Sequence, residues 1–298
     1  MADIKLFEIK EKIEEKIAST VFLEKELQNL IEENMETFFG VRFLKSEYII
    51  TNGRMDSIGI DENNSPVIFE YKRSSSENVI NQGLFYLDWL LDHKSDFKLL
   101  VIEKFGMEAS NKIDWSVPCV ICIANDFTKY DLHAVNQMQR NIKLVRYKKY
   151  GENLLLFEHL NAPVVKTIDD KKIENVKQSS NGTKTHLEKL LSVPKNILNI
   201  YESVCGYIES LGDDIVANQL KLYLAYKKVK NIACIEIYNS YVLMYLKLNP
   251  DTVELEEGFT RDARNIGHYG TGDLSIKLRN MDDLEKAKPI IQRAYIEG

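Results

Sequence analysis

Apolar residues in the first half of the chain change repeatedly between helical and strand spacing. Residues 7–18, in which Ile9, Ile13 and Ile17 lie four apart, and residues 22–39 both show the period of a helix. The other apolar segments are short and bounded by turn residues. We expect strands at 41–45, 48–51, 53–61, 66–72, 98–104, 118–124, 142–147 and 154–158, and further helices at 77–93 and 128–139. This order predicts an α/β domain with a mixed sheet flanked by helices.

A change of composition marks the end of this domain. Lys, Asp, Asn, Ser and Gly dominate residues 162–185, which we interpret as a linker between domain 1–161 and domain 186–298. In the second domain we expect helices at 186–191, 194–211 and 282–296, and strands at 220–227, 232–238, 241–248 and 274–278. These elements predict a small α+β domain with an antiparallel meander.

Charged side chains occupy unusual places in the two strands around residue 60. Side chains alternate along a strand, so Glu70 and Lys72 share one face of an otherwise apolar segment. Burying such charges is costly unless they pair or hold a metal ion. The polar turn 61–66 folds the chain back, which brings Asp56 on the first strand close to Glu70.

Two converging carboxylates beside a lysine suit a divalent-metal site that hydrolyses phosphodiester bonds. Carboxylate oxygens favour Mg²⁺ or Mn²⁺, which Asp56 and Glu70 would bind, and such ions also bind substrate phosphates. Lys72 would orient the attacking water or stabilise charge on the phosphate. In the alternative interpretation Glu70 and Lys72 form an exposed ion pair, worth less than about 1 kcal/mol.

The residues around these three positions resemble a nuclease family. Gly-Arg-Met-Asp at 53–56 and Val-Ile-Phe-Glu-Tyr-Lys-Arg at 67–73 are similar to the PD-(D/E)xK superfamily, and in particular to the EndoMS/NucS mismatch endonucleases. The whole chain resembles bacterial and archaeal proteins that add a C-terminal DUF5655 domain. The resemblance implies a restriction-endonuclease-like fold, with Asp56, Glu70 and Lys72 as the catalytic set; Met55 replaces the proline that names the motif. It also implies DNA as the substrate and a possible homodimer.

Two helices carry further candidates by the same resemblance. Glu26, on the first long helix, matches a glutamate that completes the metal site, although it is equally a solvent-facing acid. Gln82 and Tyr86 lie four apart, and therefore on one face of the helix that follows the Glu70 strand. In similar nucleases such a pair reaches the site or the substrate backbone. The alternative is that Tyr86 is a core aromatic with Gln82 at its edge.

Basic side chains are concentrated in the stretch 140–149, with tyrosines between them. This stretch is the best local candidate for contact with a phosphate backbone. The predicted nucleic-acid-binding residues are Arg54, Arg73, Tyr86, Arg140, Arg146, Lys148 and Lys149. In the second domain His268 lies in a glycine-rich turn and, with Asp273, Tyr226, Lys227 and Arg261, is a candidate for a ligand or nucleic-acid surface.

Composition limits these hypotheses without excluding them. The 298 residues carry a net charge of −6, whereas dedicated DNA-binding proteins are usually basic. The four cysteines are scattered through apolar runs and indicate a reducing, cytoplasmic setting, and no apolar run is long enough to span a membrane. We therefore expect a Mg²⁺- or Mn²⁺-dependent endonuclease that acts on nucleic acid, DNA rather than RNA, with the C-terminal domain recognising a substrate or partner. The alternative is an inactive binding module on a nuclease fold.

Overall fold

The chain is organised as two compact units. The structure, a computed structural model of the chain, describes residues 4–19, 23–72, 78–138, 140–160 and 184–298. The first unit contains Met1–Ile60, Pro66–Lys112 and Pro118–Val164. The second contains Val165–Gly298 together with the short segments Asp61–Ser65 and Ile113–Val117.

The first unit is built on a mixed seven-stranded sheet in the order β3-β8-β7-β6-β5-β4, with β9 paired to β8. The antiparallel hairpin β5–β6 lies beside the parallel strands β6, β7 and β8. The strands are β3 (Ala18–Ser19), β4 (Val41–Ile50), β5 (Gly53–Asp61), β6 (Pro66–Lys72), β7 (Cys119–Ala124), β8 (Ile142–Tyr150) and β9 (Leu154–His159). The predicted mixed α/β sheet is confirmed.

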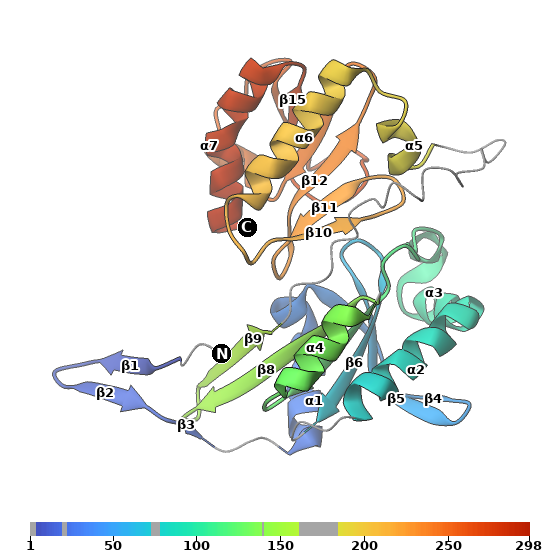
Figure 1. Cartoon of the computed structure of the whole chain (residues 1–298), viewed down its shortest axis with the longest axis vertical. Helices are drawn as coiled ribbons and strands as arrows, with labels where there is room; N and C mark the ends of the chain where they lie inside the picture. Colours follow the sequence, from blue (N-terminus) through green and yellow to red (C-terminus); the bar gives the residue numbers. More distant parts are fainter. Residues whose placement is uncertain (1–3, 20–22, 73–77, 139, 161–183) are drawn as a thin grey trace. The chain divides into compact units, whose positions relative to one another are not determined.

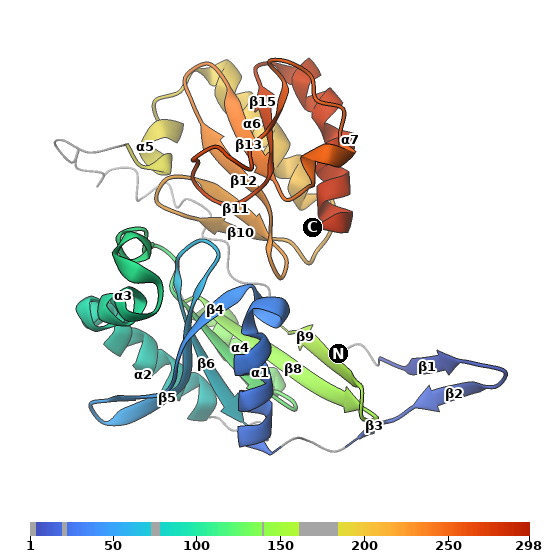
Figure 2. The same cartoon turned by 180° about the vertical axis from the view of Figure 1, so that it is seen from behind.

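Helices cover both faces of this sheet. Helix α1 (Glu24–Phe39) lies on one face, and α2 (Asn78–Asp92) and α4 (Lys129–Gln137) lie on the other, as Figures 1 and 2 show from opposite sides. The α1 face is a core of buried side chains from the helix and from β6, β7 and β8, including Ile31, Phe69 and Ile121. Glycine 83 lets α2 approach the sheet closely, because a Cβ there would lie 2.7 Å from the Val120 side chain.

Residues 7–18 form a hairpin, so the expected helix is wrong. Strands β1 (Leu6–Ile9) and β2 (Ile13–Lys16) pair antiparallel, with Ile9 opposite Ile13. A spacing of four residues is typical of a helix. Two residues four apart can, however, also face each other across a hairpin with a three-residue turn, as Ile9 and Ile13 do. Isoleucine, branched at Cβ, favours the strand.

Residues 98–104 are helical, so the strand expected there is also wrong. They lie within α3 (Lys94–Asn111), in which Phe97 and Val101 are buried while Leu99 is exposed. A short apolar run does not by itself distinguish a strand from a helix. Here the buried side chains lie four apart, which is the helical spacing.

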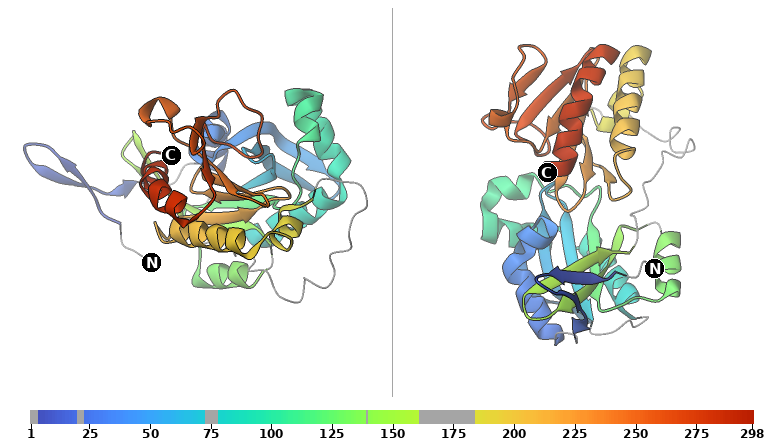
Figure 3. Two further views of the ribbon diagram at one scale, coloured as in Figure 1. Left: turned by 90° about the horizontal axis from the view of Figure 1, so that it is seen from above. Right: turned by 90° about the vertical axis from the view of Figure 1, so that its left-hand side faces the viewer.

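The second unit contains a six-stranded sheet in the order β10-β11-β12-β13-β15-β14, with all pairs antiparallel. Its strands are β10 (Val216–Gln219), β11 (Leu224–Lys227), β12 (Asn231–Ile237), β13 (Val242–Leu246), β14 (Thr260–Asp262) and β15 (Leu274–Leu278). Helices α6 (Lys195–Glu209) and α7 (Met281–Glu297) lie side by side on one face of the sheet (Figure 3, right), and the short helix α5 (His186–Leu190) precedes them. The α+β architecture expected for the second domain is confirmed. No helix in the described ranges is long and apolar enough to cross a membrane.

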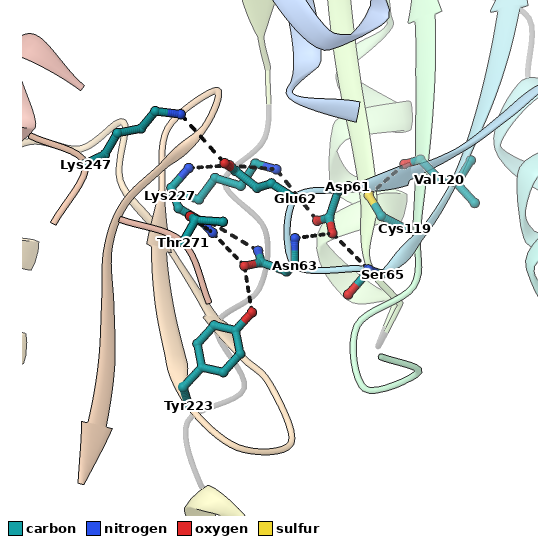
Figure 4. A network of polar contacts seen from close by, with 11 residues as sticks. Asp61, Glu62, Asn63, Ser65, Cys119, Val120, Tyr223, Lys227, Lys247 and Thr271 are labelled. Atoms are coloured by element: carbon teal, nitrogen blue, oxygen red, sulfur yellow. Dashed lines mark hydrogen bonds and ion pairs between the residues drawn. The ribbon is translucent and has the colours of Figure 1, made fainter. Parts of the chain in front are cut away.

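Polar contacts tie the segment Asp61–Ser65 into the second unit (Figure 4). The Asn63 Oδ1 atom accepts hydrogen bonds from Asn231 Nδ2 at 2.6 Å and from the Tyr223 hydroxyl at 3.0 Å. The Lys227 ammonium group lies between Asp61 (3.7 Å) and Glu62 (3.8 Å). Because these groups are buried, their mutual pairing is what makes their burial tolerable.

Candidate active site

Strands β5 and β6 bring Asp56 and Glu70 together. The Asp56 backbone N–H donates to Glu70 Oε1 at 3.3 Å, and the Tyr71 backbone N–H donates to Asp56 Oδ2 at 3.0 Å. The antiparallel register, in which Ser57 lies opposite Phe69, sets this arrangement. Both carboxylates therefore lie where the sequence predicted them, next to each other across the hairpin.

Glu70 is fully buried and only half satisfied. Its side chain is 0% exposed, and its Oε2 atom has no hydrogen-bond partner. Burial and then the nearby Asp56 carboxylate raise the pKa of Glu70 to about 9. Burial also raises the pKa of Asp56, while the Tyr71 N–H and the Lys72 charge act against that change. The protein alone does not supply enough positive charge to keep both carboxyl groups ionised.

Lys72 completes the predicted set but is paired with an unexpected acid. Its ammonium nitrogen lies 3.6 Å from Glu24 Oε1 on helix α1. Glu26, the helix acid that we had proposed for the metal site, accepts a hydrogen bond from the Leu23 backbone N–H at 3.0 Å and so caps α1. Glu24, two residues earlier, is the α1 carboxylate on the side of Lys72. Its charge also helps to raise the pKa of Asp56.

Gln28 is a site residue that the sequence analysis missed. It is 5% exposed, and its amide nitrogen donates to the Asp56 carbonyl at 2.8 Å and to Glu32 Oε1 at 2.8 Å. Glu32 in turn accepts a hydrogen bond from the Ser57 hydroxyl at 2.5 Å. The signal was present in the sequence, since residues 24, 28 and 32 are four apart and share one helix face.

Gln82 and Tyr86 on α2 interact with each other and with the start of β5. Gln82 Nε2 donates to the Tyr86 hydroxyl at 2.8 Å, and the Arg54 backbone N–H donates to the same hydroxyl at 3.3 Å. Tyr86 is 4% exposed and packs on Gly53, where a Cβ would lie 2.7 Å from the tyrosine ring. Tyr86 thus holds the strand that carries Asp56. Gln82 remains a candidate for substrate contact.

The predicted basic stretch is largely engaged in ion pairs. Arg146 is 6% exposed and pairs with Glu158 at 2.5 Å and Asp126 at 3.2 Å, so its burial excludes the role we expected for it at a phosphate backbone. Arg140 pairs with Asp88 at 3.0 Å, and Lys149 pairs with Glu152 at 3.0 Å. Tyr147 and Tyr150 are buried, which leaves them no exposed face for a base.

Arg54, Arg73 and Lys148 are the remaining residues of the predicted phosphate-contact set. Arg54 is exposed and pairs with Glu47 at 3.0 Å. Arg73 lies outside the described residues. Lys148 is partly exposed on β8 and stays a candidate for phosphate contact.

Of the residues predicted around His268, the structure places Tyr226 and Lys227 elsewhere, while the charges of Arg261 and Asp273 act on the His268 ring. Tyr226 lies in the core beneath the helices of the second unit, and its hydroxyl donates to Glu209 at 2.8 Å. Lys227 is committed to Asp61 and Glu62. His268 lies against the Tyr245 ring, with centroids 4.0 Å apart, and Arg261 is exposed.

The donor set of the β5–β6 hairpin fits a divalent cation. Two carboxylates lie together, and one of their oxygens, Glu70 Oε2, is buried without a partner. Within the described part of the chain no group of three or more His, Cys, Asp or Glu side chains could hold a metal ion. A hard ion such as Mg²⁺ commonly takes only one or two protein carboxylates and completes its shell with water and substrate phosphate.

Two family models match the chain in separate regions. The C-terminal domain of endonuclease NucS matches residues 23–103, which contain Asp56, Glu70 and Lys72. The domain of unknown function DUF5655 matches residues 187–296 in the second unit. An uncharacterised protein of Haemophilus influenzae is 31% identical over 280 residues, which cover 91% of this chain and 92% of that protein.

Solved structures with similarity to the chain include a repair endonuclease and EndoMS. A repair endonuclease from Pyrococcus abyssi is 17% identical with a TM-score of 0.29, over 48% of this chain and 65% of that one. A structure of EndoMS in complex with double-stranded DNA is 18% identical with a TM-score of 0.26, over 48% and 64% of the two chains. The chain thus aligns with just under two thirds of the length of these two proteins.

Proposed function

This chain belongs to the family of the uncharacterised Haemophilus influenzae protein and joins a NucS-type endonuclease domain to a DUF5655 domain, and we propose that it is a Mg²⁺- or Mn²⁺-dependent endonuclease. Its reaction would be hydrolysis of phosphodiester bonds in DNA. The similarity to endonucleases supports DNA over RNA. The C-terminal domain would recognise the substrate or a partner.

A single observation carries the proposal: the unpartnered Glu70 Oε2 beside Asp56. Glu70 is 0% exposed, and an isolated buried carboxylate is costly unless a cation compensates it. Neither Asp56 nor Glu70 forms an ion pair with another residue of the described ranges within 4 Å. Both carboxylates are therefore available to a divalent cation.

The residues of the site have separable tasks in such a reaction. Water attacks phosphorus, the P–O bond to the departing sugar oxygen breaks, and that oxygen takes up a proton. A bound divalent ion would neutralise charge on the phosphate and make the attacking water more acidic. Lys72 would stabilise the negative charge that builds on the phosphate oxygens. Gln28 would keep the Asp56 backbone in place through its carbonyl hydrogen bond.

Metal binding tests the site independently of the unknown substrate sequence. We would titrate Mn²⁺ into the wild-type chain by calorimetry, with Asp56→Asn and Glu70→Gln as variants, and look for anomalous density at the hairpin in crystals. Binding to the wild type that each variant weakens by at least about tenfold would support the proposal. Glu33→Gln, a change at an exposed α1 acid, is the matched control and should bind as the wild type does.

The alternative function is a non-catalytic nucleic-acid-binding or protein-interaction module. The pairing of Lys72 with Glu24 at 3.6 Å favours it, since that lysine is partly neutralised. Duplex and mismatched DNA would then be assayed with the wild type and Lys72→Ala. Absence of Mn²⁺ binding and of cleavage, with retained DNA binding, would establish the module and reject the endonuclease.

A further inference from the structure

The second unit contains two short segments that lie, in the sequence, between elements of the first unit. Asp61–Ser65 is the turn that joins β5 to β6, and Ile113–Val117 precedes β7. Strands β5 and β6 carry Asp56 and Glu70, the two carboxylates of the candidate metal site. The turn of the hairpin that carries this site is therefore part of the second unit.

A buried lysine of the second unit lies between the two acids of this turn (Figure 4). Lys227 on β11 is 4% exposed, and its ammonium nitrogen lies 3.7 Å from Asp61 Oδ2 and 3.8 Å from Glu62 Oε1. Burial raises the pKa of Glu62, and the charge of Lys227 is the largest effect that opposes this rise. Removing one partner of a buried ion pair leaves an uncompensated charge. The conformation of the turn therefore depends on Lys227.

A pair of buried amides holds the same turn by hydrogen bonds. Asn63 and Asn231 are 2% and 0% exposed, and the side-chain nitrogen of each donates to the side-chain oxygen of the other, at 3.1 Å and 2.6 Å. The Tyr223 hydroxyl also donates to Asn63 Oδ1 at 3.0 Å. Within the turn, the backbone N–H groups of Asn63 and Ser65 both donate to Asp61 Oδ1 at 2.9 Å. A buried polar network that is satisfied in this way specifies one conformation.

The conformation of a hairpin turn determines the register of the two strands that it joins. In β5–β6 Ser57 lies opposite Phe69, and this register brings the Asp56 backbone N–H to Glu70 Oε1. A shift of either strand by one residue would turn its side chains to the other face of the sheet. Glu70 lies four residues beyond the start of β6, which is about 13 Å along the strand. The turn therefore acts on the site through the register of the strands.

We propose that the second unit positions the candidate metal site by holding the β5–β6 turn, with Lys227, Asn231 and Tyr223 as the positioning residues. The inference rests on the proposed function, because the site in question is the one assigned there to a divalent cation. It extends that function by giving the second unit a role in forming the site, in addition to recognition of a substrate or partner.

Coupling between the turn contacts and the metal site must be reciprocal. If the turn contacts favour the arrangement of Asp56 and Glu70 that binds a cation, cation binding strengthens the turn contacts by the same factor. We therefore expect Mg²⁺ to slow hydrogen exchange of the backbone amides in residues 61–65 more than that of the amides in β8, as measured by mass spectrometry. Asp56→Asn should abolish this difference. Turn contacts that only stabilise the fold would not respond selectively to the metal ion.

Lys227→Met tests the proposal, because methionine keeps a long unbranched side chain and removes the charge. We expect this variant to bind Mn²⁺ at least about fivefold more weakly than the wild type in calorimetry. Without metal, its β5–β6 amides should exchange faster, while those of β8 should not. Lys227→Arg keeps the cation and should restore both properties. Lys228→Met is the matched control, because this neighbouring lysine pairs with Asp214 at 3.4 Å, and it should leave both measurements unchanged.

A milder variant decides if Lys227→Met does not fold, as judged by circular dichroism. Tyr223→Phe removes one hydrogen bond to Asn63 and should shift both measurements in the same direction by a smaller amount. If the wild type binds no Mn²⁺, the proposed endonuclease is rejected, whereas the metal-free exchange of β5–β6 still decides whether the second unit holds the hairpin. Wild-type Mn²⁺ affinity in both variants, or β5–β6 exchange that neither variant changes, would overturn the proposal.

Discussion

The Glu70 carboxyl group has a physical reason to keep its proton in the metal-free protein. It is buried, it faces the Asp56 carboxylate, and its Oε2 atom has no partner. In an unfolded chain the same group titrates near its ordinary value of 4.5. Folding without a metal ion therefore requires a proton at neutral pH, and metal binding must release it.

This linkage predicts that the stability of the metal-free protein falls as pH rises from about 4.5 to about 9. In that window the folded state holds a proton that the unfolded state has released, and each pH unit costs up to about 1.4 kcal/mol. Glu70→Gln should remove the slope and be more stable than the wild type at pH 8. Urea unfolding at several pH values measures this. Saturating Mn²⁺ should restore the stability of the wild type at pH 8 but not change that of Glu70→Gln. If the metal-free wild type is as stable at pH 8 as at pH 5, the predicted linkage is wrong.

Local spacing predicted the strand residues of the site but not the helix residues. The positions of Asp56, Glu70 and Lys72 follow from alternation along two strands joined by a short turn. That inference does not depend on how distant parts of the chain pack. Choosing between Glu24 and Glu26 requires the rotation of α1 about its axis, and that is set by packing of Leu27, Ile31 and Met35 on the sheet. Gln28 was missed for the same reason.

At the scale of elements, Gln28 joins helix α1 to strand β5. Its amide nitrogen donates to the Asp56 carbonyl, Glu32 and Ser46, the last at 3.2 Å. Gln28→Leu keeps the volume but leaves these acceptors without their donor, which should cost about 1–3 kcal/mol of unfolding free energy.

The same substitution should weaken Mn²⁺ binding, because the Asp56 backbone loses an anchor. Thermal denaturation and calorimetry measure the two effects, and Glu33→Ala on the exposed side of α1 serves as the control. A Gln28→Leu protein with wild-type Mn²⁺ affinity would show that Gln28 is structural only.

Helix α5 docks through a buried histidine. His186 is 0% exposed, both of its ring nitrogens lack hydrogen-bond partners, and its ring packs edge-on against Tyr201 at 5.5 Å. Burial, with a smaller effect of Lys189, lowers the pKa of His186 to about 4 from 6.5. The folded state therefore disfavours the charged ring.

Stability of the second unit should consequently be complete above pH 6.5 and be lost as pH falls towards 4. In this window the unfolded chain binds a proton that the folded state does not bind. The free energy of unfolding therefore falls by up to about 1.4 kcal/mol for each pH unit. His186→Phe should flatten the profile between pH 4 and 6.5 in denaturant titrations. His133→Gln, at an exposed histidine, should leave the profile unchanged, and an equal slope in His186→Phe would refute the assignment.

The type of an element was predicted correctly where a clear apolar pattern extends along the segment, and wrongly where the pattern rests on a few residues. Helix α1 and the strands β5 and β6 have patterns that only one element type satisfies. The β1–β2 hairpin does not, because the isoleucine spacing fits a helix as well as a strand pair across a tight turn. Its side chains Ile9 and Ile13 are 85% and 69% exposed, so no core contact was available to decide between the two.

At the scale of the whole molecule, charge is the feature that bears on DNA binding. The net charge is −6, and several basic side chains expected to contact phosphate are neutralised by carboxylates of the same chain. Affinity for a duplex grows with the number of phosphates that a protein neutralises. Because these predicted contact residues are paired within the chain, we expect it to bind DNA weakly and with a shallow dependence on salt.

We expect the logarithm of the DNA association constant to fall with the logarithm of salt concentration with a slope of magnitude below about 3, which corresponds to about three phosphate contacts. Glu47 offers a way to change this number, because its carboxylate pairs with Lys25 at 2.6 Å and with Arg54 at 3.0 Å. Glu47→Gln frees both cations and should steepen the slope by up to about two and raise affinity at low salt. Fluorescence anisotropy between low and physiological salt measures both quantities, with Glu108→Gln, which frees Lys112, as the control. A slope that Glu47→Gln and Glu108→Gln change equally would mean that overall charge, and not the Arg54 region beside the hairpin, governs contact with DNA.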